Sequence, residues 1–86
     1  SLFFLNVPAP IYDEEYSIEV NEKVKNTIKL YNNLLNKTIS NYDFNIIDVY
    51  TLTVGSDGFS NGLFHIDKRH LSPDAVPEIE KQIFAL

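Results

Sequence analysis

The chain has 86 residues, a formal net charge of −5 and no cysteine, and 44% of its residues are hydrophobic. This length fits one small domain or part of a larger one, and the apolar fraction is too high for a disordered segment. The negative charge argues against nucleic acid or a membrane as the main partner. The missing cysteines exclude disulfides and thiolate metal sites, and they permit a reducing compartment such as the cytoplasm.

The first apolar stretch, residues 2–7, is interrupted only by Asn6. Such a continuous run is typical of a parallel strand that is buried on both faces, and Pro8 and Pro10 end it. No basic segment precedes an apolar core, so the sequence shows no signal peptide. Methionine is absent and the chain opens directly on this strand, from which we expect a chain that lacks its original start.

The acidic residues 13–15 follow in a loop, where we expect a solvated tip. A long helix is predicted from Ser17 or Asn21 to about Ser40, because apolar residues recur at a spacing of three to four or close multiples of it. The predicted apolar stripe of this helix comprises Ile18, Val24, Ile28, Tyr31, Leu35 and Ile39.

Residues 44–50 are rich in aromatic and β-branched side chains, which predicts a second strand. Strand, helix and strand in this order form a βαβ unit with parallel strands and a right-handed crossover. The fold class is therefore α/β. Two parallel strands cannot bury both faces and both edges with two helices alone, so we expect either further strands from outside this chain or pairing between chains through exposed sheet edges.

A loop of about twenty residues precedes the last helix, with turn signals at residues 55–58 and 61–62. Ser72 suits the N-cap of this helix, and Pro73 suits its first position. Loops of this length in compact domains usually carry function. The expected apolar face of the helix comprises Val76, Ile79, Ile83 and Leu86.

The long loop places Asp67 three residues before His70. A carboxylate at this spacing can accept the Nδ1–H of the imidazole, fix its tautomer and leave Nε2 to act as a base. One alternative is structural, with Asp67 capping a turn and His70 packing at the entrance of a helix. Another groups His65, Asp67 and His70 as metal ligands, although their spacing matches no known zinc pattern and a fourth ligand is missing. No serine stands in a nucleophile motif.

Residues 45–73 are similar to the C-terminal region of SGNH (GDSL-type) hydrolases. In that family a strand ending in Asp-Val-aromatic, here residues 48–50, leads to a loop that holds Asp-x-x-His, here residues 67–70, and then to the last helix. Residues 2–10 resemble the preceding strand, and residues 31–35 resemble the crossover helix. The resemblance therefore covers nearly the whole chain.

The resemblance implies a three-layer α/β fold with a flavodoxin-like parallel sheet, of which residues 1–86 form a single incomplete domain. It implies hydrolysis of a small-molecule or carbohydrate ester through an acyl-enzyme, without metal or cofactor. His70 would be the general base and Asp67 would orient it. The family's nucleophilic serine and its oxyanion glycine and asparagine lie upstream of the matched region, so we expect the 86 residues alone to be inactive. The alternative is a non-catalytic, self-associating module derived from such a hydrolase.

Overall fold

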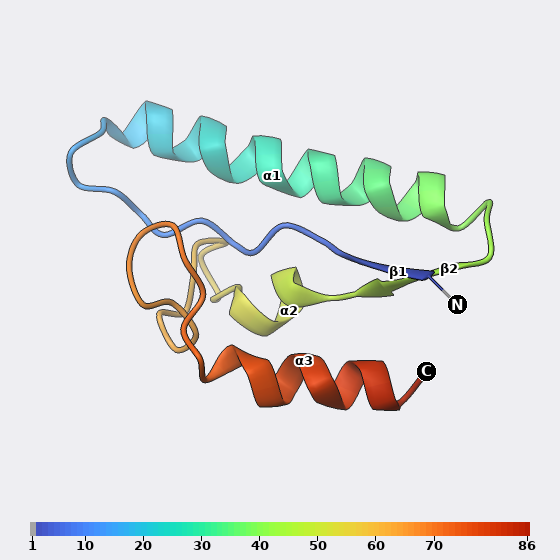
Figure 1. Cartoon of the computed structure of the whole chain (residues 1–86). Coiled ribbons are helices and arrows are strands. Elements are labelled where there is room, and N and C mark those ends of the chain that lie inside the picture. Colours follow the sequence, from blue (N-terminus) through green and yellow to red (C-terminus); the bar gives the residue numbers. More distant parts are fainter. Residues whose placement is uncertain (1) are drawn as a thin grey trace.

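The computed structural model describes residues 2–86 and has a mixed α/β fold over that range. In chain order its elements are β1 (Leu2–Leu5), α1 (Ile18–Ile39), β2 (Phe44–Ile47), α2 (Val49–Thr53) and α3 (Ala75–Phe84). The sheet lies between α1 on one side and α3 on the other (Figure 1). Both long helices pack mainly against β2, which is buried at Ile47 and exposed at Phe44. The predicted α/β class is confirmed.

The two strands pair in parallel, with Leu2 opposite Phe44 and Leu5 opposite Ile47. The backbone N–H of Asn6 extends the ladder by donating to the carbonyl oxygen of Ile47 at 3.2 Å. Parallel strands need a crossover connection, and α1 supplies it. The predicted strand–helix–strand unit is therefore confirmed.

β1 departs from the prediction of a strand buried on both faces. All four of its side chains are between 41% and 60% exposed. Successive residues of a strand point to opposite faces, so neither face of β1 is covered. The physical reason is that the two long helices lie over β2, and within residues 2–86 no strand pairs with the outer edge of β1.

The residues at its two ends explain where α1 begins and ends. Ser17 Oγ accepts the backbone N–H of Val20 at 3.1 Å and so satisfies one of the free donors of the first turn. Glu19 in the first turn and Lys37 in the last turn complement the helix dipole. The observed range agrees with the predicted helix from about Ser17 to about Ser40.

The inward face of α1 is less apolar than predicted. Asn21 and Asn32 are buried at 4% and 8% exposure, whereas three members of the predicted stripe are exposed: Ile18, Val24 and Tyr31. The amide of Asn32 accepts the N–H of Val7 at 2.9 Å and donates to the Val7 carbonyl oxygen at 2.8 Å. A side-chain amide thus takes the place of a neighbouring strand in satisfying the backbone just after β1.

β2 ends at Ile47, earlier than the predicted limit at Tyr50. Asp48 instead caps α2. Its Oδ1 accepts the backbone N–H of Thr51 at 2.9 Å and its Oδ2 accepts the Thr51 hydroxyl at 2.7 Å. The prediction of a longer strand is wrong because an aspartate at this point offers the next turn a helical cap.

Asn6, just after β1, supports the same short helix. Its Oδ1 accepts the backbone N–H groups of Val49 and Tyr50 at 2.7 and 2.9 Å, and its Nδ2 donates to Asp48 Oδ1 at 3.0 Å. The first turn of α2 therefore has its free donors satisfied by side chains from the ends of both strands.

The loop after α2 contains the two predicted turns. Gly58 and Gly62 have φ angles of +86° and +77°, a backbone region that glycine adopts at little cost. Both turn signals are confirmed.

α3 begins at Ala75, with Asp74 rather than Ser72 at its N-cap, so Pro73 lies before the helix. The carbonyl oxygen of Ser72 accepts the N–H of Ala75 at 3.0 Å, which makes a backbone turn. The Ser72 hydroxyl is buried and has no hydrogen-bond partner within residues 2–86. Its predicted role as a side-chain cap is wrong. The predicted apolar face of α3 is only partly covered. Ile79 and Ile83 are half-buried, whereas Val76 and Leu86 are exposed.

Gln82 joins α3 to the end of β2 through its amide. Its Oε1 accepts the N–H of Asp48 at 2.7 Å and its Nε2 donates to the Asp48 carbonyl oxygen at 3.2 Å. Replacing Gln82 by alanine leaves both part-buried backbone groups without these partners, and we expect the free energy of unfolding to fall by about 1–2 kcal/mol. Chemical denaturation followed by circular dichroism measures this change. Glu80→Ala, at an exposed position of the same helix, is the control, and an equal loss in both variants would contradict the expectation.

Candidate functional site

Asp67 and His70 face one another across a tight turn. The Nδ1 atom of His70 lies 3.0 Å from each carboxylate oxygen of Asp67. An ionised carboxylate only accepts hydrogen bonds, so Nδ1 is the donor to Asp67 and Nε2 is the nitrogen left to act as a base. The structure thus brings together the two residues that the sequence singled out, with the acid positioned to fix the tautomer of the imidazole.

Asp67 also organises the backbone of this turn. Its Oδ1 accepts the N–H groups of Arg69 and His70, both at 2.8 Å. The Arg69 N–H, followed by the His70 side chain, holds the pKa of Asp67 below its usual value, so the carboxylate is ionised at neutral pH. Asp67 therefore both caps the turn and contacts the imidazole of His70. From the sequence, these two roles are alternatives.

The Asp–His turn (residues 67–70) is held at the tip of a hairpin-like loop. The Ile66 N–H donates to the His70 carbonyl oxygen at 3.0 Å, and the Ser72 N–H donates to the Phe64 carbonyl oxygen at 2.7 Å. The side chains of His70 and Asp67 are 72% and 56% exposed. A hydroxyl group from another segment or molecule can therefore reach the imidazole from solvent.

His65 makes a separate contact. Its Nδ1 lies 2.8 Å from Ser60 Oγ, which also accepts the N–H of Gly62 at 3.0 Å. Burial lowers the pKa of His65 and outweighs the nearby Asp67 carboxylate, which raises it, so this ring is neutral at pH 7. The sequence shows no sign of the Ser60 contact, because it depends on the turn at Gly62. Within residues 2–86, no group of three or more histidine, aspartate or glutamate side chains could hold a metal ion.

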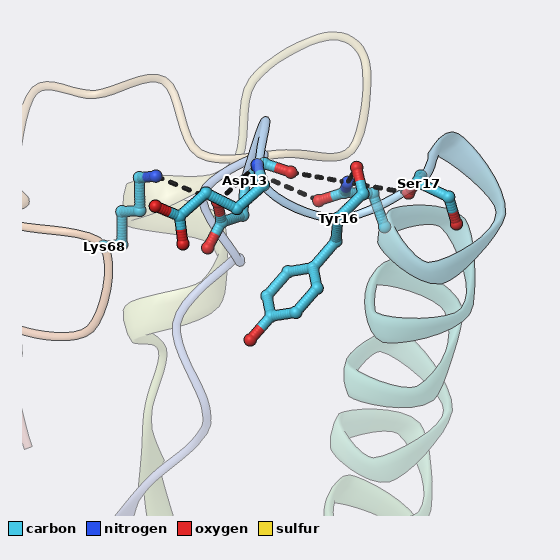
Figure 2. Close-up of polar contacts among 6 residues, drawn as sticks. Asp13, Tyr16, Ser17 and Lys68 are labelled. Atoms are coloured by element: carbon cyan, nitrogen blue, oxygen red, sulfur yellow. Dashed lines mark hydrogen bonds and ion pairs between the residues drawn. The ribbon is translucent and has the colours of Figure 1, made fainter.

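Asp13 ties the loop after β1 to the Asp–His turn. Its Oδ1 accepts Lys68 Nζ at 2.9 Å (Figure 2) and the Glu15 N–H at 3.0 Å. The Lys68 hydrogen bond, followed by that from Glu15, lowers the pKa of Asp13, and the same contact raises the pKa of Lys68. The prediction of a wholly solvated acidic tip is wrong for Asp13, because a lysine 55 positions away pairs with it.

Asn21 fixes the same loop to the first turn of α1. Its Oδ1 accepts the N–H of Asp13 at 2.8 Å, and its Nδ2 donates to the carbonyl oxygens of Asp13, Tyr16 and Ser17 at 2.9, 3.3 and 2.9 Å. From the sequence, Asn21 is only an alternative start of the helix. A buried amide that makes this many bonds holds the loop in a defined position beside Lys68.

Comparison of the chain with protein-family models, curated proteins and solved structures finds no match. No helix within residues 2–86 has both the length and the apolar character that crossing a bilayer requires.

Proposed function

We propose that this chain is the C-terminal part of an ester hydrolase of the SGNH type, with His70 as the general base and Asp67 as the residue that orients it. The observation that supports this most directly is the 3.0 Å contact of His70 Nδ1 with both oxygens of Asp67. A carboxylate in this place fixes the base and stabilises the imidazolium that forms when Nε2 takes a proton. The resemblance of residues 45–73 to that family adds the reaction class.

In the proposed reaction, a serine supplied by a preceding part of the protein is the nucleophile. The Nε2 atom of His70 takes the serine proton as the serine oxygen attacks the ester carbonyl. His70 then gives this proton to the leaving alcohol, and an acyl-enzyme remains. Water then attacks the acyl-enzyme while His70 takes its proton, and His70 returns this proton to the serine oxygen as the carboxylic acid leaves. Asp67 stays ionised throughout.

The same proposal places β1 and β2 in a larger, flavodoxin-like parallel sheet. The accessible surface of the chain is 6147 Å², whereas a folded monomer of 9.9 kDa has about 5,200 Å². The surplus of about 900 Å² is close to one side of a standard protein interface, about 800 Å². The exposed faces of β1 account for part of it, and a neighbouring strand with its helix would cover them.

Ester hydrolysis by the complete protein tests this function. We expect the complete protein to hydrolyse p-nitrophenyl acetate and to be labelled at a single serine by a fluorophosphonate. Residues 1–86 alone should do neither, because the proposed nucleophile and oxyanion donors lie elsewhere. A folded complete protein that neither turns over the ester nor takes the label would contradict the proposal. Small-molecule and carbohydrate esters are the proposed substrates.

The open sheet also favours a second candidate, a non-catalytic module that pairs with another copy of itself through the edge of β1. The observations behind it are the four exposed apolar side chains of β1 and its unpaired outer edge within residues 2–86. Sedimentation of the 86-residue chain at low micromolar concentration separates the candidates. A folded monomer excludes the module, whereas a dimer combined with an inactive complete protein favours it.

A further inference from the structure

A cavity of about 290 Å³ lies between the segment after β1 and the first half of α1. Residues 7–11 form one wall, and Val24 and Ile28 form the other. The ring of Tyr16, which also lines the cavity, extends into the space between these two segments (Figure 2). Since a cavity of about 150 Å³ is enough for benzene, this one has room for a six-carbon chain.

The wall formed by residues 7–11 is apolar and held in place. Pro8 and Pro10 have no N–H group, and the N–H of Ala9 donates to Thr53 Oγ1 at 2.8 Å, outside the cavity. The wall therefore offers few hydrogen-bond donors to an occupant. It is also formed before any ligand binds, which reduces the entropic cost of binding.

The polar side of the cavity comes from the Asp–His turn. Lys68 and Arg69 line it together with Asp13. Lys68 is bonded to Asp13, whereas Arg69, the only arginine of the sequence, makes no ion pair within residues 2–86 and meets the Asp13 charge only at longer range. Glu14 and Glu15 lie outside the lining, but their charges act on Lys68. The lining itself holds two cations, Lys68 and Arg69, and one carboxylate, Asp13, so it carries a net positive charge beside an apolar wall.

We propose that this cavity binds an organic anion with an apolar body, with the carboxylate at Arg69 and the chain against Val24 and Ile28. A guanidinium matches a carboxylate with two parallel N–H···O bonds. The apolar walls favour a hydrocarbon chain over a small hydrated ion. The binding site goes beyond the proposed hydrolase and needs no nucleophile, because its whole lining belongs to residues 7–69.

Titration of the ¹⁵N-labelled chain with sodium hexanoate, followed by amide shifts in NMR spectra, tests the proposal. We expect saturable shifts in the first half of α1 and in residues 65–69, with a dissociation constant on the order of millimolar for so small a ligand. Hexan-1-ol and hexylammonium have the same chain without the negative charge. Both should bind at least about five-fold more weakly. Equal binding of hexan-1-ol, tighter binding of hexylammonium or unsaturable shifts would overturn the proposal.

Three variants locate the site. Arg69→Gln should raise the dissociation constant for hexanoate about five-fold, and Val24→Ser should raise it through the loss of apolar contact. Lys37→Gln removes the same charge at the far end of α1 and should leave the constant unchanged. An unchanged constant in Arg69→Gln overturns the proposal. If the chain binds hexanoate but the complete protein has no esterase activity, the binding site stands and the proposed hydrolase function is wrong. If the complete protein is an active esterase but the chain does not bind hexanoate, only the binding site is wrong.

Discussion

Replacing His70 by alanine in the complete protein is expected to lower kcat for p-nitrophenyl acetate by about a thousand-fold. The imidazole is the proposed base, and the other histidine of the chain, His65, has its Nδ1 in contact with Ser60. KM should change little, because the base acts on a proton rather than on the binding of the substrate. Steady-state kinetics measures both quantities, and unchanged turnover would remove His70 from the mechanism.

Two further measurements separate loss of the base from loss of the fold. Added imidazole should restore part of the activity of His70→Ala, since a diffusible base can replace the missing ring. Asp67→Asn should cause a loss at least as large, about a thousand- to ten-thousand-fold, because an amide that donates to Nδ1 leaves the proton on Nε2 and the ring in the wrong tautomer for a base. Glu80→Ala, at an exposed position of α3, is the control and should retain full activity. His70 is 72% exposed, so its removal should leave the circular dichroism spectrum unchanged.

Replacing Asn6 by alanine is expected to lower the free energy of unfolding by about 3 kcal/mol. Its amide accepts the N–H groups of Val49 and Tyr50 and donates to Asp48. Val49 is buried, so its N–H has little access to water as a replacement partner. Urea denaturation measures the change. Asn33→Ala, at an exposed position of α1, is the control, and a loss no larger than that of this variant would contradict the expectation.

Replacing Asn6 by aspartate is expected to make the loss of folding stability depend on pH. In the wild type, burial raises the pKa of Asp48, but hydrogen bonds from the Thr51 N–H, the Asn6 amide and the Thr51 hydroxyl together hold it below its usual value. The stability from Asp48 is therefore present above about pH 4 and is lost as the pH falls. A second carboxylate beside Asp48 raises the pKa of one of the pair. Relative to wild type, Asn6→Asp should be least destabilised near pH 3 and increasingly destabilised as the pH rises.

The elements that sequence reasoning placed correctly are those decided by neighbouring residues. The three-to-four spacing of apolar residues predicts α1 from Ser17 or Asn21 to about Ser40, and the structure adds the cap, in which Ser17 Oγ accepts the Val20 N–H. The glycines of the two predicted turns have the positive φ angles that such turns use. The Asp67–His70 contact belongs to the same class, because its two residues are three positions apart on one turn.

Sequence reasoning failed where a side chain from a distant segment replaced a local partner. β2 was expected to continue to Tyr50, but the Asn6 amide, 43 positions before Val49, accepts the first donors of a helix there. The inward positions of α1 were expected to be apolar, but Asn32 is buried because it satisfies the backbone of Val7. An asparagine has no apolar signal, so hydrophobic periodicity cannot mark such positions.

By itself, the sequence determined the order of the two strands and the two long helices, the parallel pairing and the acid–imidazole contact at residues 67–70. Each follows from residues close in the chain or from the few possible βαβ connections. Only the tertiary structure decided which polar side chains meet across segments. The contacts Asp13–Lys68, Asn6–Asp48 and Asp48–Gln82 span 55, 42 and 34 positions. Such contacts need the helices packed on the sheet, and the cavity beside Arg69 arises from the same packing.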